Sequence, residues 1–92
     1  MPKTKNAVRA LKHSRRAAWR KVADEAVILD VDTAHYFSLR GCGLRAWELL
    51  GAPLTPAALT ERLRAEYEGA TLDRDVAELL KSLRAAGLIE PV

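Results

Sequence analysis

Residues 27–50, VILDVDTAHYFSLRGCGLRAWELL, decide the fold of this chain. The stretch opens with β-branched and large apolar residues, which favour an extended strand. Asp32-Thr33-Ala34 predicts a turn, because an aspartate side chain can hydrogen-bond its own backbone two residues on. Residues 35–39 then continue as a strand whose side chains alternate between two faces. Glycines on either side of Cys42 interrupt the extended chain before apolar residues resume at helical spacing.

Two more strands are expected upstream of residue 35. Residues 17–22 (AAWRKV) predict a first strand anchored by Trp19, and residues 26–31 predict a second. The polar residues between them suit a tight turn. With residues 35–39 as the third strand, the three make an antiparallel meander. The third strand then has a free edge unless the N-terminal segment covers it.

Three helices are expected after the strands. Leu44 and Trp47 recur at helical spacing in the first, and Gly51 suits the left-handed position just past its end. Thr55-Pro56 is a strong start signal for the second helix, because threonine can cap it and proline fits its first turn. Thr71 is expected to cap the third helix, which carries an apolar stripe. The stripe consists of Leu72, Val76, Leu79, Leu80 and Leu83.

The end of the third helix completes the expected fold. Gly87 ends the helix, and Leu88 can fold back on Leu83 in a Schellman-type cap. The order of elements predicts an α+β domain, a three-stranded antiparallel sheet followed by three helices. Because the last two helices resemble a helix-turn-helix, the architecture is winged-helix-like.

Length and composition indicate one small globular domain. The chain has 92 residues, of which 49% are hydrophobic and 29% charged. No apolar run approaches the roughly 20 residues that span a bilayer, and no secretory signal is present. The single cysteine, Cys42, cannot form an internal disulfide. These features predict a cytoplasmic protein.

The charge is divided unevenly along the chain. Residues 1–16 carry six of the fifteen basic residues and no acid, whereas the other nine bases face twelve acids. Residues 1–16 are expected to be a disordered basic tail, and residues 17–92 the folded domain. A basic tail can also hold nucleic acid or an acidic surface electrostatically.

No catalytic group, cofactor or metal site is predicted. His13 lies in the tail and His35 at a strand start, and neither has a nucleophile at a recognisable spacing. Cys42 could be activated at a helix start, but a small residue at a cap position is the simpler interpretation. The glycines beside it do not form a phosphate-binding loop, which needs a third glycine and a strand–helix–strand setting.

Nucleic acid is one alternative, because helix-turn-helix architecture invites it. A recognition helix brings basic or amide side chains to base edges. The third helix instead places Asp73 and Asp75 in its first turn, where they would face phosphates. A winged-helix DNA-binding protein, with the basic tail as its phosphate contact, is therefore the second interpretation.

Peptide recognition fits the expected fold better. A free strand edge beside an apolar helix can accept an extended peptide as a fourth strand. Phe37, Leu39, Leu80 and Leu83 are also expected to serve the core. A dimerisation module using the same edge is a third interpretation, since two such edges can pair.

Residues 27–90 resemble the PqqD family, the stand-alone form of the RiPP recognition element. The resemblance depends on several segments together: VILDVDTAHYFSL, LRAWELL, the Thr-Pro start, Arg74-Asp75-Val76 and the ending LRAAGLIE. Three residues depart from the family pattern: Arg40 replaces an asparagine, Cys42 a capping threonine and Ala34 a turn glycine. The second strand typical of the pyrroloquinoline quinone proteins is missing, so the chain is more similar to the lasso-peptide leader-binding members.

The resemblance implies a non-catalytic peptide chaperone or adaptor. Such proteins bind the leader of a ribosomally made precursor peptide and present it to a modifying enzyme or leader peptidase. No membrane partner is expected, and the chain would be a monomer or an edge-paired or swapped dimer. The resemblance places the leader along one strand and one helix. The implied contacts are His35, Tyr36, Phe37, Ser38, Asp75, Val76, Glu78, Leu79, Ser82 and Leu83.

Overall fold

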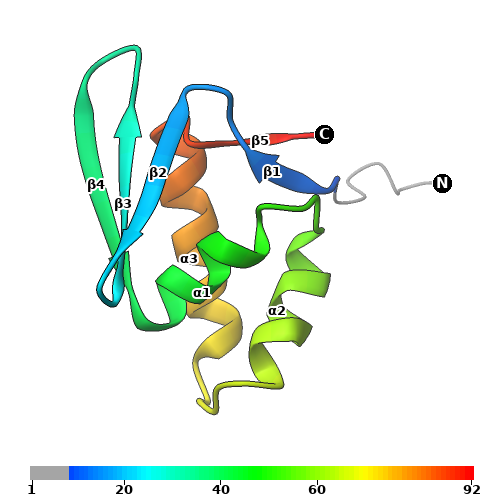
Figure 1. Ribbon diagram of the computed structural model, residues 1–92. Coiled ribbons are helices and arrows are strands. Elements are labelled where there is room, and N and C mark those ends of the chain that lie inside the picture. Colours follow the sequence, from blue (N-terminus) through cyan, green and yellow to red (C-terminus); the bar gives the residue numbers. More distant parts are fainter. Residues whose placement is uncertain (1–8) are drawn as a thin grey trace, which may run out of the picture.

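The computed structural model describes residues 9–92. A three-stranded sheet stands on one side, and three helices pack together on the other (Figure 1). A second, two-stranded sheet closes one end of the molecule. The elements are β1 (Leu11–His13), β2 (Ala17–Val22), β3 (Glu25–Asp30), β4 (His35–Arg40), α1 (Gly41–Leu49), α2 (Pro56–Arg64), α3 (Leu72–Ala85) and β5 (Ile89–Pro91).

The predicted meander is confirmed. Strands β2, β3 and β4 are antiparallel and lie in the order β2-β3-β4, so β3 is central and β4 is an edge strand. Two alanines, Ala23 and Ala34, make the connecting turns with φ of +56° and +64°. The second turn is not organised by Asp32, as the sequence suggested, but by Asp30. Its Oδ1 accepts a hydrogen bond from the backbone N–H of Asp32 at 3.0 Å.

The core lies between the meander and the helices. Ala26 and Ile28 point from β3 toward the helices and are fully buried, because alternate side chains of a strand share a face. Trp47 of α1 is the largest fully buried side chain among residues 9–92. The apolar stripe predicted for α3 is buried along most of its length, at Leu72, Val76, Leu80 and Leu83.

The expected disordered tail must be corrected for residues 11–16. Residues 11–13 form β1, which pairs antiparallel with β5 at the other end of the chain. Ser14 is buried and its N–H bonds to the Leu88 carbonyl, and the Arg16 carbonyl accepts the N–H of Val31. Leu11 is 4% exposed, and its backbone exchanges hydrogen bonds with Leu54 at 2.8 and 3.1 Å. The burial of Leu11 and this long-range pairing explain why so basic a segment is ordered. Residues 1–8 lie outside the described part of the chain.

Two predicted helix boundaries are confirmed by their hydrogen bonds. The Thr55 side chain caps α2 by accepting from the Ala58 N–H at 3.1 Å. Gly87 has a φ of +76° and donates its N–H to the Arg84 carbonyl. The next N–H, that of Leu88, bonds back to Leu83 at 3.0 Å, which completes the Schellman motif.

Three other helix boundaries differ from the sequence expectation. Helix α1 begins at Gly41, so the glycine segment starts the helix rather than preceding it. Gly51 is not among the described glycines with positive φ, because α1 ends at Leu49 without a left-handed residue. The Thr71 hydroxyl makes no capping bond to the α3 backbone and instead donates to Asp75 Oδ2 at 2.9 Å.

Candidate peptide-binding site

Strand β4 has an open edge in the described part of the chain. It pairs with β3 alone, and the ordered part of the N-terminal segment pairs with β5 instead of covering it. His35, Tyr36 and Ser38 are exposed, and Tyr36 retains 71% of its surface. Phe37 is half-buried against the core. The edge therefore has free backbone groups, two apolar side chains, Phe37 and Leu39, turned toward the core, and Tyr36 and Ser38 turned to solvent on the other face.

A hollow of about 170 Å³ lies where β4 runs into α1. Because α1 begins directly after β4, its first turn brings Cys42 and Gly43 to the end of the edge strand. Leu39, the last inward residue of β4, packs beside Gly43; a Cβ built on this glycine would lie 3.6 Å from the leucine Cδ2. Helix α3 supplies the other wall. The lining residues are Cys42, Gly43, Asp75, Val76 and Leu79.

The structure brings together three of the six predicted α3 contacts. Asp75, Val76 and Leu79 all line the hollow, and Leu79 is the half-buried apolar residue that a ligand could still reach. Val76 is 2% exposed, so it serves as the floor of the hollow and as part of the core.

The other three α3 residues lie on later turns of the helix. Glu78 and Ser82 are exposed, as expected for a polar rim. Leu83 is 4% exposed and belongs to the core, where its carbonyl accepts the capping bond of the helix end. Leu83 therefore offers little surface to a peptide.

The sequence analysis did not predict that Cys42 and Gly43 line the hollow. In the sequence, these two residues indicate only an interruption between a strand and a helix. A usable signal was present, because two small residues directly after an edge strand leave room beside it. Their opposite wall, α3, is about thirty positions further along the chain, so only the tertiary fold joins the two sides.

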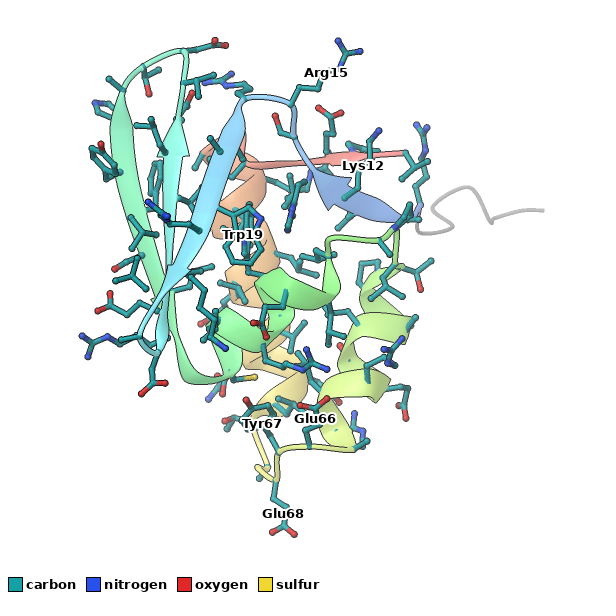
Figure 2. All side chains as sticks on the ribbon, viewed as in Figure 1. Lys12, Arg15, Trp19, Glu66, Tyr67 and Glu68 are labelled. Atoms are coloured by element: carbon teal, nitrogen blue, oxygen red, sulfur yellow. The ribbon has the colours of Figure 1, made fainter. Side chains whose placement is uncertain are left out.

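The electrostatics of the hollow are mildly acidic. Burial raises the pKa of the Cys42 thiol, and the negative charges of Asp75 and Glu66 raise it further. Glu66 lies in the loop after α2, at the same end of the molecule as Glu68 (Figure 2). A raised pKa keeps the thiol protonated at neutral pH, which argues against an activated nucleophile.

The two histidines occupy unrelated environments. His35 is exposed at the start of β4. His13 stacks on Trp47 with ring centroids 3.8 Å apart, and its Nε2 lies 2.7 Å from the Trp47 carbonyl oxygen. Trp19 packs edge-on against both rings, at 6.0 Å from His13 and 6.1 Å from Trp47. His13 is thus a packing residue.

Residues 9–92 contain neither a cluster of metal ligands nor a membrane-spanning helix. No group of three His, Cys, Asp or Glu side chains in this part of the chain is placed to hold a metal ion. None of its helices has the length and apolar character needed to cross a bilayer.

Comparison with known proteins identifies relatives of this fold. The family model for coenzyme PQQ synthesis protein D (PqqD) matches residues 25–89. No curated protein sequence matches the chain closely enough to be compared. Among solved structures, TbiB1 in complex with the TbiA(beta) leader peptide is similar with a TM-score of 0.79 and 32% identity, over 86% of this chain and 94% of that one.

A second solved structure shares the fold. It is a lasso peptide synthetase B1 complexed with the leader peptide, with a TM-score of 0.76 and 24% identity. The similarity covers 88% of this chain and 98% of the other. The family match spans most of the chain and includes β3, β4 and all three helices. The resemblance predicted from the sequence is therefore confirmed, and the chain belongs to the PqqD family.

Proposed function

We propose that this protein is a non-catalytic adaptor that captures the leader of a ribosomally synthesised precursor peptide by strand addition to β4. The observation that carries the proposal is the open edge of β4 beside the hollow of about 170 Å³. The similarity to TbiB1, which is solved with a leader peptide, supports it. The sequence resemblance to the lasso-peptide leader-binding members of the family makes a lasso-like precursor the favoured class.

Strand addition would use the two parts of the site differently. The backbone of β4 would supply hydrogen bonds that do not depend on the leader sequence. Side chains of the leader would alternate, half of them facing α3. One of these would enter the hollow and contact Leu79, with Asp75, Glu78 and Ser82 as the polar rim. Selectivity would therefore come from the hollow, and much of the affinity from the strand.

The proposal includes a partner enzyme. An adaptor without chemistry of its own has to present the bound precursor to a modifying enzyme or a leader peptidase. The cytoplasmic location stays a prediction from the single cysteine, and the oligomeric state remains a choice between a monomer and an edge-paired or swapped dimer. Edge pairing of two copies through β4 would compete with the leader.

The DNA-binding interpretation receives no support. Asp73 and Asp75 occupy the first turn of α3 and are exposed, so the end of the helix that enters a groove is acidic. Lys12 and Arg15 lie at the far end of the molecule from the loop that leads into this turn (Figure 2). Lys12 and Arg15 therefore lie too far from the start of α3 to support its contact with a duplex.

An NMR titration tests the proposal. Isotope-labelled protein is titrated with the leader of a candidate precursor, and shifts are expected on β4, at the start of α1 and on α3. Leu79→Arg should weaken binding at least about tenfold, because it fills the hollow with a charged side chain. Ala77→Arg, the same residue placed at an exposed position of α3, is the control and should bind normally. Melting curves check that both variants fold.

Two results would contradict the proposal. Unchanged affinity in folded Leu79→Arg would remove the hollow from the site. Shifts with duplex DNA centred on α3, steeply weakened by salt and absent with any leader, would favour the DNA-binding alternative.

A further inference from the structure

The face of the meander that points away from the helices is uncovered in the described part of the chain (Figure 1). Three cross-strand rows make up this face. The first joins Ala18, Leu29 and Tyr36, which lie directly opposite one another on the three strands. The second row joins Arg20, Val27 and Ser38, and the third joins Val22, Glu25 and Arg40.

The first two rows form an apolar depression. This outward depression has a volume of about 310 Å³. Its lining residues are Ala18, Trp19, Arg20, Val27, Leu29 and Tyr36. Tyr36 at one side of the face is 71% exposed, and Val22 further along it is 50% exposed. Apolar surface gathered in this way on a small domain marks an interaction site more often than chance exposure.

The unpaired charge on this face is positive. Arg20 lines the outward depression and makes no ion pair with another described residue. Its neighbour Lys21 bonds to Glu48 at 3.4 Å, and the carboxylate of Glu25 is held by Arg40 at 2.8 Å. The face therefore offers one free cation and no free acid. A second copy presenting the same face would bring another cation, so a different protein with a carboxylate fits better.

The depression is continuous with the proposed leader strand. A peptide added beyond β4 would place one residue next to Tyr36 and would extend the row from Ala18 to Tyr36 by a fourth position. Alternate leader side chains would point outward, away from α3. The outward face of a loaded molecule would thus consist partly of this chain and partly of its leader.

We infer that this outward face docks the enzyme that acts on the bound precursor, and that the enzyme reads the composite surface. The inference rests on the proposed function, because the fourth strand is the leader. The enzyme would place apolar side chains in the outward depression and a carboxylate near Arg20. Since part of the surface is supplied by the leader, the enzyme binds the loaded protein more tightly than the empty one.

The test uses the full-length protein, a precursor peptide that it binds, and the enzyme that processes that precursor. Arg20→Glu reverses the charge of the exposed Arg20, and Leu29→Gln makes the floor of the outward depression polar. Leader affinity, measured by fluorescence anisotropy, should stay within about twofold of the wild type, whereas the rate of precursor processing should fall about tenfold. Arg62→Glu, the same reversal on exposed α2, is the control and should process normally.

Several outcomes would overturn the inference. Normal processing with both Arg20→Glu and Leu29→Gln would remove the outward face from enzyme docking while leaving leader binding intact. Equal affinity of the enzyme for loaded and empty wild-type protein would refute the composite surface. A concentration-dependent dimer that Leu29→Gln abolishes would assign the face to a second copy. Failure of the wild type to bind any leader is a different result, because it would contradict the proposed function first.

Discussion

Arg16 holds Asp30 through two hydrogen bonds, from Nη2 to Oδ2 at 2.7 Å and from Nε to Oδ1 at 3.3 Å. Asp30 is 2% exposed, and its Oδ1 also accepts the N–H of Asp32. The guanidinium lies over the end of α3, because a Cβ on Gly87 would meet it at 3.3 Å. One ion pair therefore lies where the turn before β4 comes close to the end of α3.

The Arg16–Asp30 pair should make the fold sensitive to acid. The hydrogen bond from Arg16 lowers the pKa of Asp30 from 3.8 to about 2. Because the folded pKa is below the unfolded one, the carboxylate stabilises the fold above pH 3.8 and loses this effect as the pH falls toward 2. Asp30→Asn should lower the urea midpoint at pH 7 and flatten the fall between pH 4 and 2.

The control for this prediction is Asp24→Asn. Asp24 is exposed in the β2–β3 turn and makes no ion pair with the described residues, so its replacement should leave the midpoint at pH 7 nearly unchanged. A midpoint in Asp30→Asn equal to that of the wild type would mean that the buried pair contributes nothing to stability.

His13 should make the fold weaken at mildly acidic pH. Burial lowers the pKa of His13 below 6.5, and the hydrogen bond to the Trp47 carbonyl only partly opposes this. The unfolded chain takes up the proton first, so stability should decline as the pH drops below 6.5 and level off below the folded pKa. Urea midpoints at pH 7 and pH 5 measure this decline.

Two variants test whether His13 is the residue that makes stability depend on pH. His13→Gln cannot be protonated and should abolish the difference between pH 7 and pH 5, although it loses the stacking on Trp47. His35→Gln, at an exposed position, should keep the difference because His13 is intact. A decline that persists in His13→Gln would assign the sensitivity to another residue.

Ala34→Gly should stabilise the protein. Ala34 has a φ of +64°, a conformation that costs an L-residue about 1–2 kcal/mol and glycine almost nothing. Glycine also loses more entropy on folding, so the expected net gain is roughly 0.5–1 kcal/mol. Ala77→Gly, the same change within α3, should destabilise by about 1 kcal/mol. Thermal melts that move in the same direction for both variants would contradict this explanation.

Local sequence signals were sufficient to predict the three-stranded meander and two helix boundaries. Thr55-Pro56 and Gly87 each act through bonds to neighbours within five residues, so their roles can be predicted without the rest of the fold. The positive φ of Ala34 likewise agrees with the glycine that the family places there.

Long-range features could not be predicted. Strand β1 has only three residues within a basic segment, and its partner β5 lies at the other end of the chain. Its order depends on Leu11 meeting Leu54 and on the stacking of His13, neither of which leaves a periodic pattern. The hollow was missed for the same reason, because its two walls come from α1 and α3.

Cys42 should report directly on the occupancy of the hollow. It is the only cysteine of the chain, it is half-buried, and it lines the hollow with Leu79. Burial and nearby acids raise its pKa above that of a free cysteine, so less thiolate is present at pH 8. Iodoacetamide should therefore react slowly at pH 8 and faster as the pH rises. A saturating leader should slow this reaction about tenfold further, because it covers the thiol.

Conversely, alkylation of Cys42 before the leader is added should weaken leader binding. The added carboxamidomethyl group would occupy part of the 170 Å³ hollow, so leader affinity should fall about tenfold. Cys42→Ser nearly preserves the volume and should bind the leader normally, with or without iodoacetamide treatment. If fully alkylated protein bound the leader as tightly as untreated protein, the leader would not enter the hollow. Strand addition to β4 would then have to act through its backbone and Phe37 alone, because the wall that Cys42 shares with Leu79 would play no part.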